Sequence, residues 1–203
     1  MIMKKSIITV SILTLFGSMA FSQAQVAVGI KGGLNFANVD ASSVGAAYNS
    51  RTGYHAGAFV LVKFGKIGIQ PELIYSKQGS NIKINTSNFD SNIDYLNIPI
   101  IVKLYTVAGI NIQVGPQFGF VTGANGPVQD LQGNTTLQDI KSQLKSSDIS
   151  AALGLGWDAP FGLTFDARYN LGLTKVNDAA SSSDIKNQVI QVSIGYKLFK
   201  FGK

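Results

Sequence analysis

Residues 67–79 read IGIQPELIYSKQG and hold the feature on which the fold assignment depends. Apolar side chains such as Ile69, Leu73 and Tyr75 alternate with polar ones, and this period of two predicts a β-strand. The middle of the strand carries Glu72, so one of its faces must accommodate a carboxylate. Because an ionised group is costly in hydrocarbon, the polar face has to point away from any lipid.

The same alternation recurs in eight segments along the chain, bounded by Gly, Asn, Ser and Asp. Each segment is long enough to cross a bilayer as a tilted strand, which takes about 9 to 11 residues. The expected strands are 25–36, 53–64, 67–79, 93–105, 109–122, 148–158, 162–174 and 188–199.

The connections between these strands alternate between short turns and long polar loops. Outer-membrane barrels combine an even number of strands with short periplasmic turns and long extracellular loops. The sequence therefore predicts an all-β fold: an eight-stranded antiparallel up-and-down transmembrane β-barrel with both termini on the periplasmic side. The expected turns lie near 65–66, 106–108 and 159–161, and the expected loops are 37–52, 80–92, 123–147 and 175–187.

The first 24 residues have the layout of a cleaved secretory signal peptide. Lys4 and Lys5 precede an apolar stretch from Ile7 to Phe16, and small residues follow it. The apolar stretch is too short to be a membrane-spanning helix. We expect residues 1–24 to be removed during export through the inner membrane, leaving one domain, residues 25–203, in the cell outer membrane.

The composition argues against several other classes of protein. The 203 residues contain no cysteine, so no disulfide and no thiolate ligand is available. The formal charge of +6 comes from scattered basic residues, whereas a nucleic-acid surface gathers them into a stripe. Clustered metal ligands and a phosphate-binding loop are also missing from the sequence. We therefore expect no metal site, no cofactor and no nucleic-acid partner.

Alternation defines two faces, and a lipocalin-like soluble barrel would turn the apolar one inward. The polar face, however, is rich in Gly, Ala, Ser and Gln, as in 113–119 and 150–156. A water-washed face would contain few glycines, because Gly weakens a strand. Eight strands enclose a space just wide enough for side chains to fill. We therefore expect a side-chain-filled lumen and an apolar face in contact with lipid.

The charged residues of the polar face predict an ion-pair network inside the lumen. We expect its centre at Glu72, Asp166 and Arg168, with Lys103 as a further partner. Pro71, beside Glu72, should face lipid, and Pro71, Pro99 and Pro116 should each mark a bulge or a local break in pairing. The full set of luminal charges is Lys31, Lys63, Glu72, Lys103, Asp166, Arg168 and Lys197.

Two further patterns concern the surface of the barrel. Aromatic residues of the apolar face gather near both ends of the strands, as expected for two interfacial girdles. In the third loop, residues 135–148 place Leu137, Ile140 and Leu144 at helical spacing, which fits a short amphipathic helix or a mobile loop.

Four stretches resemble the PorT-like family of outer-membrane β-barrels from Gram-negative bacteria. They are QPELIYSKQG at 70–79, YLNIPIIVKLY at 95–105, GPQFGFVTG at 115–123 and VIQVSIGYKLF at 189–199. The resemblance implies an eight-stranded barrel, and one member of the family takes part in exporting proteins to the cell surface. The closing GYKLF resembles the signal read by the barrel-assembly machinery, which implies that this machinery is a partner during insertion.

The sequence gives weak grounds for catalysis. His55 is the single histidine, and Ser76, Ser150 and Asp94 are the candidate companions, but such a set can be picked from any chain this rich in Ser and Asp. We therefore expect that the protein is not an enzyme but a porin-like barrel without a wide pore. Its expected role is structural or surface-binding, and its expected partners are lipid and a surface or periplasmic protein. The alternatives are an accessory of protein export and, third, a lipid-modifying enzyme.

Overall fold

The computed structural model describes residues 24–40, 48–84, 87–129, 135–143, 147–173 and 186–202. The proposed signal peptide lies almost entirely outside these residues, and so does most of the expected loop at 175–187. Among the described residues, no helix is long and apolar enough to cross a membrane.

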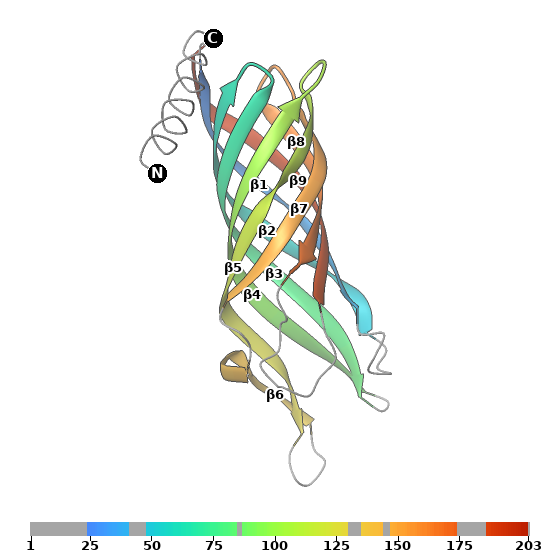
Figure 1. Ribbon diagram of the computed structural model, residues 1–203. Coiled ribbons are helices and arrows are strands. Elements are labelled where there is room, and N and C mark those ends of the chain that lie inside the picture. Colours follow the sequence, from blue (N-terminus) through green and yellow to red (C-terminus); the bar gives the residue numbers. More distant parts are fainter. Residues whose placement is uncertain are drawn as a thin grey trace, which may run out of the picture.

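Eight long strands form a closed antiparallel barrel, as the sequence predicts (Figure 1). Each strand pairs with the next along the chain, β5 pairs with β7 across the inserted hairpin, and β1 pairs with β9 to close the cylinder. The short turns and both described chain ends lie at one end, the periplasmic end by the rule for outer-membrane barrels. The barrel strands are β1 (Gln25–Asp40), β2 (Tyr48–Phe64), β3 (Ile67–Ile84), β4 (Ser87–Tyr105), β5 (Ile110–Gln129), β7 (Ser147–Asp158), β8 (Leu163–Gly172) and β9 (Lys186–Phe201).

Burial alternates along the strands with the polar side chains inside. In β8, Thr164, Asp166, Arg168 and Asn170 are buried, whereas the residues between them are exposed. Glu72 is only 4% exposed while its neighbour Pro71 lies on the outer surface. The apolar residues of the outer face are exposed on every barrel strand. The expected orientation of the two faces is therefore confirmed, and the lipocalin-like alternative is wrong.

Two apolar clusters inside the lumen were not expected. Ala27, Phe59 and Leu61 pack together near the periplasmic end. Tyr95 and Val121 pack near the outer end, with Ala124. In β2 the run AGAFVLVKF is apolar on both faces, so alternation there cannot separate inside from outside. The lumen therefore contains an apolar cluster toward each end in addition to its polar side chains.

The prolines interrupt the backbone pairing between neighbouring strands without changing its register. Between β2 and β3 the pairs Phe59↔Glu72 and Val62↔Ile69 keep one register, and the pairs between them, opposite Pro71, are missing. The irregularities in register lie elsewhere, at Val28/Gly29, Ser50/Tyr54 and Asp94/Tyr95. Of the two expected effects, the local break is therefore observed, and the bulge at the prolines is wrong.

The strands continue far into the expected loops. Residues 80–92 were expected to be a loop, but β3 runs to Ile84 and β4 begins at Ser87, and the two pair throughout. β5 likewise runs to Gln129 and pairs beyond the barrel wall with β6 (Thr135–Asp139). The outer end of the barrel therefore carries tall hairpins, of which the β5–β6 arm reaches farthest from the termini (Figure 1).

The helix expected over 135–148 is wrong for the residues that the structure describes. Residues 135–139 form β6, and only one 3₁₀ turn, η2 (Lys141–Gln143), follows. Pairing with Asn125–Gln129 provides hydrogen-bond partners for the backbone of β6, and the Ile140 amide donates to the Ala124 carbonyl at 3.1 Å. Ile140 packs on the outer apolar cluster around Tyr95. These contacts come from a segment distant in sequence, which helical spacing cannot reveal.

A charge placed on the outer face should destabilise the barrel according to its depth. Leu153 is 59% exposed in the middle of β7, whereas Leu173, 58% exposed, lies just beyond β8. We expect Leu153→Arg to lower the free energy of unfolding by about 2 to 4 kcal/mol and Leu173→Arg by about 0 to 1 kcal/mol. Urea unfolding in liposomes measures both, and equal values for the two would contradict the proposed membrane band.

Candidate functional site

An ion pair between Glu72 on β3 and Arg168 on β8 crosses the centre of the lumen. The guanidinium donates from Nη1 to Glu72 Oε2 at 2.9 Å and from Nη2 to Oε1 at 2.7 Å. Both side chains are at most 3% exposed. β3 and β8 are four positions apart in the closed ring of eight strands, so this bidentate pair ties opposite walls together.

Asp166 extends this pair into a layer. Its Oδ2 accepts from Lys31 Nζ at 2.7 Å, and Lys31 also lies 3.5 Å from Glu72. Its Oδ1 accepts from Gln113 Nε2 and lies 3.5 Å from Lys103 Nζ. Because each carboxylate contacts more than one cation, no buried charge here depends on a single partner. We call Lys31, Glu72, Lys103, Asp166 and Arg168 the charge layer.

A third carboxylate, Asp158, was missed by the sequence analysis. It accepts from Lys103 at 3.1 Å, from Lys197 at 2.7 Å and from the Tyr105 hydroxyl at 2.8 Å. Asp158 is the last residue of β7 and has the same parity as Gly154 and Gly156. If the alternation is continued to the last residue of the expected strand 148–158, it predicts that Asp158 faces the lumen.

Lys63 is the one predicted luminal charge that the structure keeps apart from the acids. Among the described residues it has no carboxylate within 4.0 Å, and its Nζ instead lies 4.2 Å from the centre of the Tyr105 ring. The other six predicted residues make direct ion pairs within the lumen. Lys63 therefore carries a cation stabilised by an aromatic face.

His55 lies in the lumen between the charge layer and the outer end of the barrel, in a network of uncharged side chains. Its Nδ1 is 2.7 Å from Asn35 Oδ1 and its Nε2 is 2.8 Å from Ser193 Oγ. Asn35 also donates to Ser76 Oγ at 2.9 Å and accepts from Gln191. The expected companions Ser150 and Asp94 are not the partners of this histidine; it contacts residues of β1 and β9.

A serine, a histidine and an amide in series have the connectivity of a catalytic triad. Here Ser193, His55 and Asn35 are each at most 5% exposed and are packed between strand walls. A substrate would have to displace the surrounding side chains to reach Ser193. The arrangement therefore acts as a hydrogen-bonded support for the lumen.

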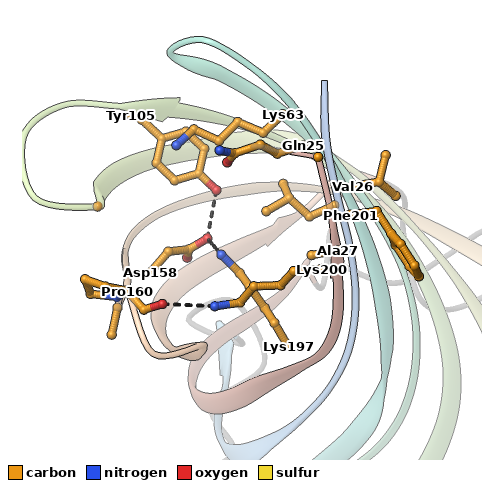
Figure 2. A pocket seen from close by; sticks show the side chains of 14 residues that line it. Gln25, Val26, Ala27, Lys63, Tyr105, Asp158, Pro160, Lys197, Lys200 and Phe201 are labelled. Carbon is orange, nitrogen blue, oxygen red and sulfur yellow. Dashed lines mark hydrogen bonds and ion pairs between the residues drawn. The ribbon is translucent and has the colours of Figure 1, made fainter. Parts of the chain in front are cut away.

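The periplasmic end of the lumen opens into a pocket of about 290 Å³ (Figure 2). Lys197 and Lys200 come from β9, and the Lys200 ammonium donates to the Pro160 carbonyl at 3.0 Å. An apolar wall of Leu61 and Ala27 belongs to the apolar cluster at this end. We call this the mouth pocket; its polar lining is Gln25, Lys63, Tyr105, Asp158, Lys197 and Lys200.

Comparisons with known proteins agree with the architecture. The sequence model of the family described as outer membrane protein beta-barrel domain matches residues 21–178. The crystal structure of Neisserial surface protein A is similar, with 12% identity, a TM-score of 0.55, and coverage of 85% of this chain and 99% of that one. That likeness supports the fold alone. No curated protein sequence matches the chain.

A second solved structure has a lower similarity. The attachment invasion locus protein Ail of Yersinia pestis, in complex with the heparin analogue sucrose octasulfate, aligns with 13% identity over 88% of this chain and 99% of that one. Its TM-score of 0.49 is too low to carry an argument about this chain.

Removing one partner of the central ion pair should be far more costly than breaking a surface pair. We expect Glu72→Ala or Arg168→Ala to lower the free energy of unfolding by about 3 to 5 kcal/mol, because the remaining charge is buried and loses its bidentate partner. A double-mutant cycle measured by urea unfolding should show strong coupling. The matched control is the half-exposed pair Lys77–Asp94 at 3.8 Å, with coupling of about 0 to 1 kcal/mol. Equal coupling in the two cycles would show that the charge layer does not join the walls.

Proposed function

The chain belongs to the outer membrane protein beta-barrel domain family, and from this premise we propose that it is a structural or surface-binding protein of the outer membrane. In this proposal the lumen carries no transport path, the protein performs no catalysis, and recognition takes place on the outer hairpins. The signal peptide and the barrel-assembly machinery would bring it to the membrane.

The charge layer is the observation that carries this proposal. Lys103 is 0% exposed, and Lys31, Glu72, Asp166 and Arg168 are at most 5% exposed, in the middle of a transmembrane cylinder. A porin keeps its lumen wide and its charges hydrated, whereas here the side chains contact one another across the full width. A solute would have to break several mutually supporting ion pairs to pass.

The outer hairpins provide the surface for recognition. β3 and β4 remain paired from the barrel to Ile84↔Ser87, and the β5–β6 arm stands beside them. The hairpin residues Thr136, Gln138 and Asp139 are exposed, so the arm offers polar groups and backbone to a partner. Rigid strands are better suited than irregular loops to hold such groups in fixed positions.

The position of the histidine supports the proposed absence of catalysis. His55 is 3% exposed and sits inside the lumen with Ser193. Neither residue lines the mouth pocket. A lipid-modifying enzyme would need its nucleophile where an acyl chain or ester can approach, which favours the binding role over the third alternative.

Protein export to the cell surface is the second candidate function. The stretches QPELIYSKQG and YLNIPIIVKLY, which resemble PorT-like barrels, form the adjacent walls β3 and β4. The mouth pocket at the periplasmic end would be the surface available to an export partner. In this role the filled lumen would exclude passage of cargo through the barrel, so the protein would assist another conduit.

The filled lumen predicts an electrically silent protein. In planar bilayers we expect the unmodified barrel to give no sustained conductance. Replacing Glu72 and Arg168 together by alanine removes the central bridge and should produce discrete conductance events, because the opened space admits water and ions. The control pair Lys77→Ala with Asp94→Ala removes as many charges outside the lumen and should remain silent. Sustained conductance of the unmodified barrel would rule out the closed lumen.

The two candidate roles differ in what deletion of the gene changes. For a structural or surface-binding protein, quantitative comparison of secreted and surface-exposed proteins should show loss of this protein alone. For an export accessory, many exported proteins should fall together. Complementation with a variant lacking 123–147 refines the result: it should fail to restore surface binding but should restore export, since the arm lies at the end opposite the mouth pocket.

A further inference from the structure

The mouth pocket has an excess of positive charge. Asp158 is its one carboxylate among the lining residues, and it is already bonded to Lys103, Lys197 and Tyr105. Lys63 lies over an aromatic ring, and Lys200 donates to a backbone carbonyl. An ammonium has three donors, so Lys200 keeps donors for an anion. The pocket is therefore suited to a group with negative charge, such as a phosphate.

A separate apolar groove lies on the outer surface where the barrel closes. It has a volume of about 340 Å³ and crosses β1, β9 and β8. Ile30 and Ile194 are each 52% exposed, and Tyr196 is 46% exposed. The groove exists because Gly32 presents no side chain between these large neighbours. We call this the seam groove; its lining includes Ile30, Gly32, Leu163, Ile194 and Tyr196.

Lys200 and Tyr196 bring the two cavities close to each other. Lys200 lines the mouth pocket and Tyr196 lines the seam groove. A Cβ added to Gly162 would lie 3.3 Å from Tyr196 Cε2 and 3.4 Å from Lys200 Nζ, so the ammonium and the ring edge are neighbours. The Lys200 ammonium thus lies near the Tyr196 end of the seam groove.

Lys200 and Tyr196 lie at the short-turn end of the barrel, where we expect the periplasmic boundary of the membrane. Leu163 is the first residue of β8 after the short turn, and it pairs with Tyr196. Tyr196 is an exposed aromatic residue near the short turns, where we expect an interfacial girdle because amphipathic rings sit at headgroup level. From there the groove runs toward Ile30 and Ile194 on the hydrocarbon side.

We propose that the seam groove and Lys200 form a binding site for an anionic phospholipid of the periplasmic leaflet. The phosphate contacts Lys200, and the field of Lys63 and Lys197 adds to its attraction. One acyl chain fills the seam groove above Gly32. A free phosphate would use the mouth pocket but would gain nothing from the groove, so the apolar groove beside Lys200 favours a lipid over a soluble anion.

Native mass spectrometry of the full-length barrel in detergent tests this site. Phosphatidylglycerol is titrated against the unmodified protein, with phosphatidylcholine and inorganic phosphate as comparison ligands. We expect phosphatidylglycerol to bind more tightly than phosphatidylcholine by about fivefold for each lysine that contacts the headgroup. Lys200→Gln should remove most of this preference.

Filling the groove tests the acyl chain independently. At Gly32 a new Cβ would meet nothing closer than His55 O at 3.4 Å, so Gly32→Leu should fold and occupy the groove. We expect it to weaken phosphatidylglycerol binding by about tenfold. Ala151→Leu, which adds three carbon atoms where Gly32→Leu adds four, enlarges the exposed face of β7 and should leave binding unchanged. Retention of the heat-dependent shift on a gel shows that each variant is folded.

Lys66→Gln completes the controls, because Lys66 lies exposed in the turn between β2 and β3 and does not line the pocket. If Lys66→Gln reduced binding as much as Lys200→Gln, the attraction would be general and the site would be refuted. Phosphatidylglycerol binding that is unaffected by Gly32→Leu would also refute it. Inorganic phosphate that competes fully with the lipid at equal affinity would identify the mouth pocket as a site for soluble anions instead.

Discussion

A charged side chain cannot face hydrocarbon at low cost, and the rest of this structure depends on that constraint. Strand alternation sends every second residue inward, so the charges of eight strands are gathered in one narrow lumen. There they are removed from water as well, and only mutual neutralisation makes their burial tolerable. The bidentate contact of Arg168 with Glu72, supported by Asp166 and Lys31, meets this requirement and at the same time holds opposite walls at a fixed distance.

The interior is organised in levels along the barrel axis. Asp158 and Lys197 lie at the periplasmic mouth, and the charge layer follows them with Phe59 alongside, since Phe59 pairs with Glu72. The uncharged network of His55 comes next, and the cluster around Tyr95 closes the outer end. The apolar cluster at the outer end limits the access of water from that side, whereas the periplasmic end opens into the mouth pocket. Low access to water strengthens each ion pair, so the levels support one another.

The sequence was sufficient to predict the features that alternation determines. The order of the strands, the inward position of Glu72 and most of the luminal charges follow from a period of two. Features that depend on contacts between distant segments were missed. The β6 strand forms because β5 continues past the membrane and offers a partner, although Leu137 and Ile140 have helical spacing. Likewise, a polar hairpin outside the membrane has no buried face, so its sequence lacks the apolar alternation of a strand and predicts a loop.

The luminal bridges also determine when the barrel can be completed. Arg168 and Glu72 are 96 residues apart, and Lys31 and Asp166 are 135 apart, while β1 finds β9 only after the whole domain has been synthesised. Such high contact order implies slow folding. Until closure, Lys31 on β1 would lack Asp166 on β8, and a wrongly registered strand would leave charges unpaired in a low dielectric. The same network that fills the finished lumen therefore acts as a register check, because only the correctly closed cylinder neutralises all of its members.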